Sequence, residues 1–344
     1  MAASERFGRG RRALVALAAV SALGAAIILA ACGGDDEETL TVYSGREEEY
    51  VGPLFERFEE ETGIELDVRY GETAELAATI LEEGDNSPAD AFFAQDAGAL
   101  GALEREGVFA PLPEDLLSRV EQRYRSPEGA WVGTSGRARV IGYNRDRVQQ
   151  AQLPDSVLEL TAPEWRGRVG WAPSNGSFQA FVTAMRVTEG EEATERWLRE
   201  MAANEPVVFD DNEAIRDAIA SGEIDVGLLN HYYVAEAIAE EGEDYPVRSH
   251  HPAGDVGSLI NVAGIGVLET ADNASDGEEL AEFVLSDGEQ RYFAEEVKEY
   301  PLVEAIPADP QVTPLAQIRQ PDVDLGQLED LEGTLQLLQR SGAL

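Results

Sequence analysis

The chain has 344 residues and a formal net charge of −41, from 67 acidic and 26 basic residues. Its length allows one large hydrophobic core or two ordinary ones. Because affinity for nucleic acid depends on Lys and Arg side chains that neutralise phosphates, so acidic a chain is not expected to bind it. An acidic, well-solvated surface is the simplest explanation of the charge.

The N-terminus has the pattern of a bacterial secretion signal, with four arginines ahead of an apolar run over residues 13–31. A run of that length could also cross a bilayer as a permanent anchor. Residues 29–32 (LAAC) resemble a lipobox, where the signal is removed and the cysteine is lipidated. Cys32 is the only cysteine and cannot form an internal disulfide. We therefore expect a lipoprotein signal peptide over residues 1–31 and a polar linker over residues 32–38 that begins with a lipidated Cys32.

Strand and helix patterns alternate after this linker. A strand over residues 39–46 precedes a helix over residues 51–62, which Gly63 ends. The same patterns predict a strand over 64–70, a helix over 73–83, a strand over 89–94 and a helix over 97–106. This β-α-β-α-β order with short connections predicts parallel strands joined by crossover helices.

Two extended segments connect this first lobe with a second. Residues 131–143 are predicted to leave the first lobe, and residues 257–268 to return to it. Between and after them we expect a strand end at 170–173, a short strand at 224–229, and helices near 178–187, 191–202, 213–220, 234–241, 277–285 and 288–297. The predicted fold class is α/β, with two lobes whose mixed, mostly parallel sheets are flanked by helices. Residues 39–135 and 262–310 would form the N-terminal lobe, and residues 136–261 and 311–344 the C-terminal lobe.

Enzyme motifs are missing from the sequence. It contains no HExxH, no GxSxG, no P-loop and no GxGxxG placed between a strand and a helix. His250 and His251 fall in a polar, proline-flanked segment and are expected on the solvated surface rather than at a metal. A secreted hydrolase is therefore only a remote alternative, since it would need a nucleophile and a base that the sequence does not offer.

Four segments are predicted to face one cleft between the lobes. Residues 43–47 and 93–96 follow parallel strands, at the edge where open α/β sheets bind ligands. Across the cleft we expect residues 174–177, which open a helix, and Tyr232 and Tyr233, which lie at a strand-to-helix junction. The helix start offers N–H groups and a positive dipole end to a small anion, although the same residues also suit an ordinary N-cap.

The adjacent tyrosines, Tyr232 and Tyr233, have two interpretations. One ring could pack into the core while the other caps the strand, or both could bind a ligand. Two phenols with neighbouring carboxylate or amide oxygens form a hard, oxygen-only set, which favours a hard, highly charged cation over zinc or copper. Ferric iron is the metal ion that best drives phenols to ionise.

Seven segments carry a family resemblance along nearly the whole mature chain: TVYSGR, ETGIELDV, SPADAFFAQDAGAL, TSGRARVIGYN, PEWRGRVGWAPSNGSF, GEIDVGLLNHYY and EYPL. With them the chain resembles the substrate-binding lipoproteins of ferric-iron ABC importers, relatives of the transferrins. The resemblance implies a class II periplasmic-binding-protein fold that closes on its ligand like a hinged clamp. It also implies a non-enzymatic monomer that carries Fe(3+), with a synergistic anion such as phosphate or carbonate, to an ABC permease. The protein would be held at the outer face of the cytoplasmic membrane by its lipid alone.

The same resemblance assigns roles to individual residues. Tyr232 and Tyr233 would ligate Fe(3+). Glu47 stands where some members have a histidine ligand, and Gln95 where they have a glutamate ligand after the third strand. Glu47 is still a hard ligand, whereas Gln95 is a poor one, so we expect an open site completed by an anion and water. The anion is assigned to a set of small polar residues: Asn175, Gly176, Ser177, Asn212 and Asn230.

An alternative within the same fold stays open. Members that lack an anion use a third tyrosine near the anion position, and that region of this chain has Trp171 and Asn175 instead. The absence of that tyrosine again favours an open site completed by an anion and water. In the alternative, the protein binds a small organic anion or a phosphonate, and Tyr232 and Tyr233 stack on it or donate hydrogen bonds.

Overall fold

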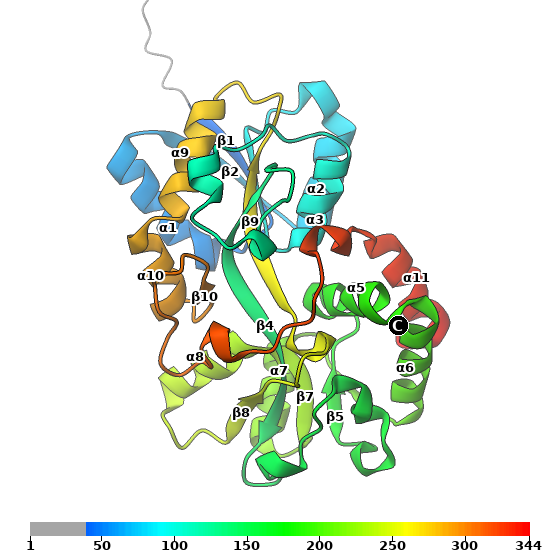
Figure 1. Ribbon diagram of the computed structural model, residues 1–344. Helices are drawn as coiled ribbons and strands as arrows, with labels where there is room; N and C mark the ends of the chain where they lie inside the picture. The colour runs from blue at the N-terminus through cyan, green and yellow to red at the C-terminus, as the bar shows by residue number, and fades with distance from the viewer. Residues whose placement is uncertain (1–38) are drawn as a thin grey trace, which may run out of the picture. The chain divides into compact units, whose positions relative to one another are not determined.

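The computed structural model describes residues 39–344 (Figure 1). The predicted signal peptide and linker, with Cys32, lie outside the described residues. Among the described residues, no helix has the length and apolar character needed to cross a membrane. The helices and strands follow in this order: β1 (Thr39–Ser44), α1 (Glu48–Thr62), β2 (Glu65–Tyr70), α2 (Thr73–Glu83), β3 (Ala91–Ala94), α3 (Ala97–Arg105), α4 (Glu114–Leu117), β4 (Val132–Asn144), β5 (Val169–Trp171), α5 (Gly176–Glu189), α6 (Glu191–Ala203), β6 (Val207–Val208), α7 (Asn212–Ser221), β7 (Val226–Asn230), α8 (His231–Glu241), β8 (Val247–His250), β9 (Ile260–Val267), α9 (Ala274–Val284), α10 (Asp287–Glu295), β10 (Tyr300–Pro301) and α11 (Leu331–Ser341).

The first part of the sheet has the predicted β-α-β-α-β order. β1 pairs in parallel with β2 and with β3, so that Val42 lies opposite both Val68 and Ala91. α1 covers these strands with apolar residues spaced at intervals of three and four, all of them buried: Val51, Leu54, Phe55 and Phe58. The helix ends at Gly63, whose φ of 79° lies in the left-handed region that glycine adopts without strain.

The long strand β4 belongs to both parts of the sheet. Residues 132–138 pair antiparallel with β9, and residues 139–143 pair antiparallel with β7. The complete order is β2-β1-β3-β9-β4-β7-β5-β6, with β10 and β8 also paired to β4. Figure 1 shows β4 and β9 running side by side; they contain the two segments predicted to be extended, over residues 131–143 and 257–268. The α/β fold class is confirmed, while the lobe boundaries proposed from the sequence stay predictions.

In the second part of the sheet β5 pairs in parallel with β6 and β7, and β4 pairs antiparallel with β7 and β8. The sequence prediction missed β8, because its residues are mostly polar and lie in a segment taken for a loop. β8 pairs with β4, and His250 stands opposite Ile141. The prediction that His250 belongs to a solvated loop is therefore wrong.

A 3₁₀ turn near the C-terminus, η8 (Leu325–Glu329), packs closely on α3. A Cβ atom at Gly98 would lie 2.4 Å from the carbonyl oxygen of Leu328, and one at Gly101 would lie 2.3 Å from that of Gly326. Only glycine can occupy these two helix positions without moving the backbone of the turn.

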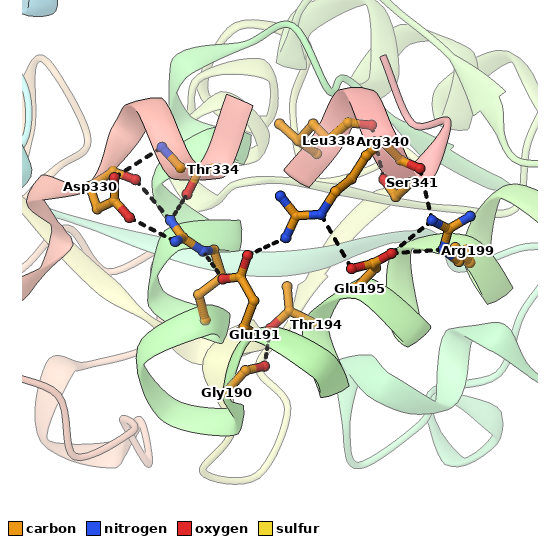
Figure 2. A network of polar contacts seen from close by, with 12 residues as sticks. Gly190, Glu191, Thr194, Glu195, Arg199, Asp330, Thr334, Leu338, Arg340 and Ser341 are labelled. Carbon is orange, nitrogen blue, oxygen red and sulfur yellow. Dashed lines mark hydrogen bonds and ion pairs between the residues drawn. The ribbon is translucent and has the colours of Figure 1, made fainter. Parts of the chain in front are cut away.

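The last helix, α11, packs on α5 and α6. Figure 2 shows the charged network that holds it there. The guanidinium group of Arg186 reaches Glu191 at 2.6 Å and Asp330 at 2.7 Å. Arg340 pairs with Glu191 and reaches Glu195 at 3.3 Å. The C-terminal segment is thus attached to α3 through η8 and to α5 and α6 through α11.

Candidate metal and anion site

The tyrosine pair lies in the first turn of α8. Asn230 ends β7 in an extended conformation, with φ −88° and ψ 149°, and the helix begins at the next residue, His231. The sequence prediction started this helix at residue 234 and therefore placed both tyrosines before it. Their rings stack with centroids 4.1 Å apart. Tyr232 is buried and Tyr233 is partly buried. The two stacked phenols therefore lie together in the first turn of the helix, largely shielded from solvent.

Burial makes both phenols harder to ionise. It raises the pKa of Tyr232 well above its ordinary value, and the neighbouring Tyr233 adds to the rise. Burial also raises the pKa of Tyr233, where a hydrogen bond from Tyr232 opposes the rise and Glu47 adds to it. Both phenols therefore keep their protons at neutral pH until a strongly charged ligand displaces them.

Glu47 and Gln95 lie together, as the sequence predicted. Glu47 is the N-cap residue of α1, and Gln95 directly follows β3. With its amide nitrogen turned toward them, Gln95 donates hydrogen bonds to Glu47 Oε2 at 3.1 Å and to Gly45 O at 3.2 Å. The charge of Glu47 also raises the pKa of Tyr233. Glu47 and Gln95 therefore lie near the tyrosine pair.

The predicted anion residues at the start of α5 form an N-cap. Asn175 Oδ1 accepts hydrogen bonds from Ser177 N at 3.0 Å, from Ser177 Oγ at 2.6 Å and from Asn212 Nδ2 at 3.2 Å. Gly176 borders open space, because a Cβ atom there would meet nothing within 4 Å. The helix start is thus capped by its own side chain and still has room beside it.

Arg139, which the sequence reading did not single out, joins the predicted anion residues. Its Nη1 donates toward Ser177 Oγ at 3.2 Å and toward the side-chain oxygens of Asn212 and Asn230, both at 3.3 Å. Its Nη2 donates to Leu228 O at 2.8 Å. None of these partners carries a negative charge. Arg139 thus brings a buried positive charge to the centre of the predicted anion group.

Burial lowers the pKa of Arg139 to about 9, and the phenols of Tyr233 and Tyr232 oppose the fall. The guanidinium group therefore lies close to the tyrosine pair and lacks a compensating carboxylate among its hydrogen-bond partners. A signal was available in the sequence: Arg137 and Arg139 are the only charged residues of β4 and stand two positions apart, so they share one face of the strand. Arg137 reaches the first part of the sheet, where it donates to Gln95 O.

Two further residues lie near the tyrosines: Arg46, which belongs to the predicted cleft segment 43–47 but was given no role of its own, and Tyr50, which was missed. Arg46 is 2% exposed and pairs with Glu299 at 3.0 Å. Its guanidinium group lies over the ring of Tyr50, 5.1 Å from the centroid. Tyr50 in turn meets Tyr232 edge to face, with centroids 6.3 Å apart. A third tyrosine therefore does lie beside the pair, but it comes from α1 and not from the region of Trp171.

The three histidines do not gather at the site as ligands. His231 is buried, and burial lowers its pKa to about 3. His250 bonds the carbonyl oxygen of Pro154 at 3.0 Å, and burial lowers the pKa of His251 to about 4. Across residues 39–344, no group of three or more His, Cys, Asp or Glu side chains is arranged to hold a metal ion. A metal site in this part of the chain would therefore depend on the phenols.

Comparison with known proteins gives a consistent result. The Fe(3+)-binding periplasmic protein of Serratia marcescens is 30% identical over 337 residues, which cover 95% of this chain and 98% of the relative. The structure of iron-bound HitA from Pseudomonas aeruginosa superposes with a TM-score of 0.82 at 31% identity, covering 88% of this chain and 99% of the other. A Trichodesmium protein (IdiA, FutA) in complex with iron and citrate gives a TM-score of 0.78 at 27% identity, over 88% of this chain and 99% of the other. Residues 86–327 match the family described as bacterial extracellular solute-binding protein. The chain belongs to this family of bacterial extracellular solute-binding proteins.

Proposed function

We propose that this protein captures ferric iron outside the cytoplasmic membrane and delivers it to an ABC importer. The observation that carries the proposal is the pair of stacked phenols, buried Tyr232 and partly buried Tyr233, beside the guanidinium group of Arg139, which has no carboxylate partner. The phenols offer hard oxygen ligands to a highly charged cation, and Arg139 offers a positive charge to an accompanying anion. The match covers 98% and 99% of the two relatives named above for iron binding, which supports the proposal.

In this proposal Tyr232, Tyr233 and Glu47 are the iron ligands. The oxygens of all three are hard, and together they would bring three negative charges to Fe(3+). Gln95 contributes less directly, because its amide nitrogen donates to Glu47 and so orients that carboxylate. Binding would release the protons that burial keeps on the phenols.

We place the synergistic anion at Arg139 and the start of α5. The residues proposed to hold it are Asn175, Gly176, Ser177, Asn212 and Asn230. Support comes from the open space beside Gly176 and from the hydrogen bonds that gather Ser177, Asn212 and Asn230 around one guanidinium group. Phosphate or carbonate fits this set of donors, since each carries charge and several acceptor oxygens.

The cellular setting follows from the N-terminal sequence. We propose that residues 1–31 are removed, that Cys32 is lipidated, and that the mature monomer stays at the outer face of the cytoplasmic membrane. An ABC permease would be its partner, and no reaction is catalysed.

An iron titration tests the function. Apo protein mixed with ferric citrate or ferric phosphate should develop a visible phenolate-to-iron charge-transfer band. Tyr232→Phe with Tyr233→Phe should abolish the band, whereas Tyr245→Phe, beyond the C-terminal end of α8, should leave it unchanged.

A wild-type protein that gives no band with excess anion present would contradict the iron proposal. It would favour the alternative, a binder of a small organic anion or phosphonate, for which Arg139 would supply the charge and the protonated phenols hydrogen bonds. Calorimetric titration with phosphate or a phosphonate, in the absence of iron, would then identify that ligand class.

A further inference from the structure

β4 changes its partners at Ala138 and Arg139. On one edge it pairs with β9 over residues 132–138, and Arg139 N continues that row by donating to Leu259 O at 2.8 Å. Successive N–H groups of a strand point to opposite edges, so Ala138 N points to the other one. On that second edge β10 pairs with Ser135 and Gly136, and β7 begins opposite Arg139. Ala138 N thus falls in the interval between two strands.

The side chain of His231 fills this interval. His231 Nδ1 accepts the hydrogen bond of Ala138 N at 3.1 Å. The imidazole ring stacks on Tyr300 of β10, with centroids 4.3 Å apart and planes 12° from parallel. The residue itself is 2% exposed and directly follows Asn230, the last residue of β7. The side chain of the first residue of α8 therefore contacts both β4 and β10.

Building on the function proposed above, we infer that His231 is a positioning residue that fixes the tyrosine pair relative to Arg139. Its neighbour in the chain is Tyr232, and the residue it bonds, Ala138, is the neighbour of Arg139. Without the hydrogen bond from Ala138 N to His231 Nδ1, the phenols and the guanidinium group would shift independently of each other. With it, the distance between the phenols and Arg139 is fixed. An anion bound at Arg139 therefore affects the binding of iron at the phenols, and iron affects the binding of the anion.

The contact with Tyr300 extends this link to the other part of the sheet. Tyr300 follows Glu299, which pairs with Arg46, and Arg46 lies over Tyr50. The histidine thus acts as a spacer between the two groups of residues that surround the phenols. A cavity of about 100 Å³ borders both His231 and Tyr300, so that side chains of altered shape can be accommodated at position 231.

Three substitutions separate the hydrogen bond from the ring stacking. His231→Asn places an amide oxygen near the position of Nδ1 and keeps the acceptor for Ala138 N. His231→Gln carries its amide further out, near the position of Nε2, and loses that acceptor. His231→Phe keeps an aromatic ring against Tyr300 and has no acceptor at all. His250→Phe is a matched control, because it removes a partly buried histidine from β8, on the opposite edge of β4.

The readouts are the wavelength of the phenolate-to-iron band and the rate at which a chelator removes iron, with and without saturating phosphate. We expect His231→Asn and His250→Phe to behave like wild type. His231→Gln and His231→Phe should lose iron about 10- to 100-fold faster, the range expected when a buried N–H group is left without its acceptor. Their band should shift, and phosphate should slow iron loss less than it does in wild type.

Unchanged iron release and an unchanged band in His231→Gln and His231→Phe would overturn the inference, even if both proteins melt at lower temperature. So would equal behaviour of His231→Asn and His231→Gln, a comparison that decides the matter if His231→Phe does not fold. Hydrogen exchange of the backbone N–H of Ala138 in the iron-free proteins gives an independent measure. We expect it to be faster in His231→Gln than in wild type, and unchanged in His231→Asn. A wild type without any band would instead refute iron binding, and amide exchange would then still report on the contact.

Discussion

The buried ion pair between Arg46 and Glu299 makes a quantitative prediction about stability. The two side chains are 1% and 0% exposed, and their charged atoms lie 3.0 Å apart. Burial opposes the charge of Arg46, but Glu299 offsets this and the pKa of the guanidinium group is raised. Glu299 also accepts a hydrogen bond from Ser135 Oγ at 2.5 Å. Glu299→Gln keeps the shape of the side chain and removes its charge; with the amide oxygen turned toward Arg46, the amide nitrogen can donate to Ser135 Oγ.

The loss of one buried partner leaves the other charge without compensation, which costs about 3–5 kcal/mol. For a protein of this size we expect a fall in Tm of roughly 6–10 °C, at about 2 °C per kcal/mol. Arg46→Met should also be destabilising, because it leaves the buried carboxylate of Glu299 without its partner. The double variant, Arg46→Met with Glu299→Gln, should lose much less stability than the two single variants together, since it buries no charge.

The assay is thermal unfolding of the iron-free protein at pH 7, followed by circular dichroism. The reasoning fails if Glu299→Gln lowers Tm by less than about 2 °C, which corresponds to about 1 kcal/mol. It also fails if the two single substitutions add in the double variant, because contacting charges should show a large coupling energy.

Three further predictions concern other parts of the molecule. Burial raises the pKa of Glu236 to about 7 from 4.5, so stability should fall as pH rises from 4.5 through 7. Glu236→Gln should then stabilise the protein by about 1–2 kcal/mol at pH 8 and hardly at all at pH 5, measured by urea unfolding, since partial exposure reduces the full effect. Gly101→Ala should destabilise the protein by about 2–4 kcal/mol, because the new Cβ would meet the backbone of η8. Gly52→Ala on α1 should instead stabilise it by about 0.5–1 kcal/mol. Equal shifts of Tm in the two variants would contradict this prediction. The side chain of Arg186 is 14% exposed and that of Arg340 is 41% exposed, so the ion pairs of Arg186 are better shielded from water. Arg186→Met should therefore speed amide hydrogen exchange in α11 more than Arg340→Met does. The reverse order would show that the shielded ion pairs do not hold the helix.

Local patterns carried much of the fold. The helical spacing of apolar residues in α1, the glycine at its end and the short connections between strands predicted parallel β-α-β units correctly. Two long segments, residues 131–143 without a helical period and the apolar residues 257–268, were predicted to be extended, and they contain β4 and β9. These features depend on residues close together in the chain, which is why the sequence revealed them. β8 was missed for the same reason, since its polar residues pair with a strand about 100 positions earlier.

The residues around the tyrosine pair required the tertiary structure. The sequence indicated Tyr232 and Tyr233, and a family resemblance supplied roles for them and for Glu47, Gln95 and the anion residues, which remain proposals. The sequence offered no reason to connect Arg139 with Ser177, Asn212 and Asn230. Nor did it connect Tyr50 with Tyr232. Composition and periodicity report which residues are buried, but a charge balance depends on which buried groups meet. Folding alone decided that a guanidinium group without a carboxylate lies beside two phenols, because these residues approach one another only after β4 has paired with both parts of the sheet.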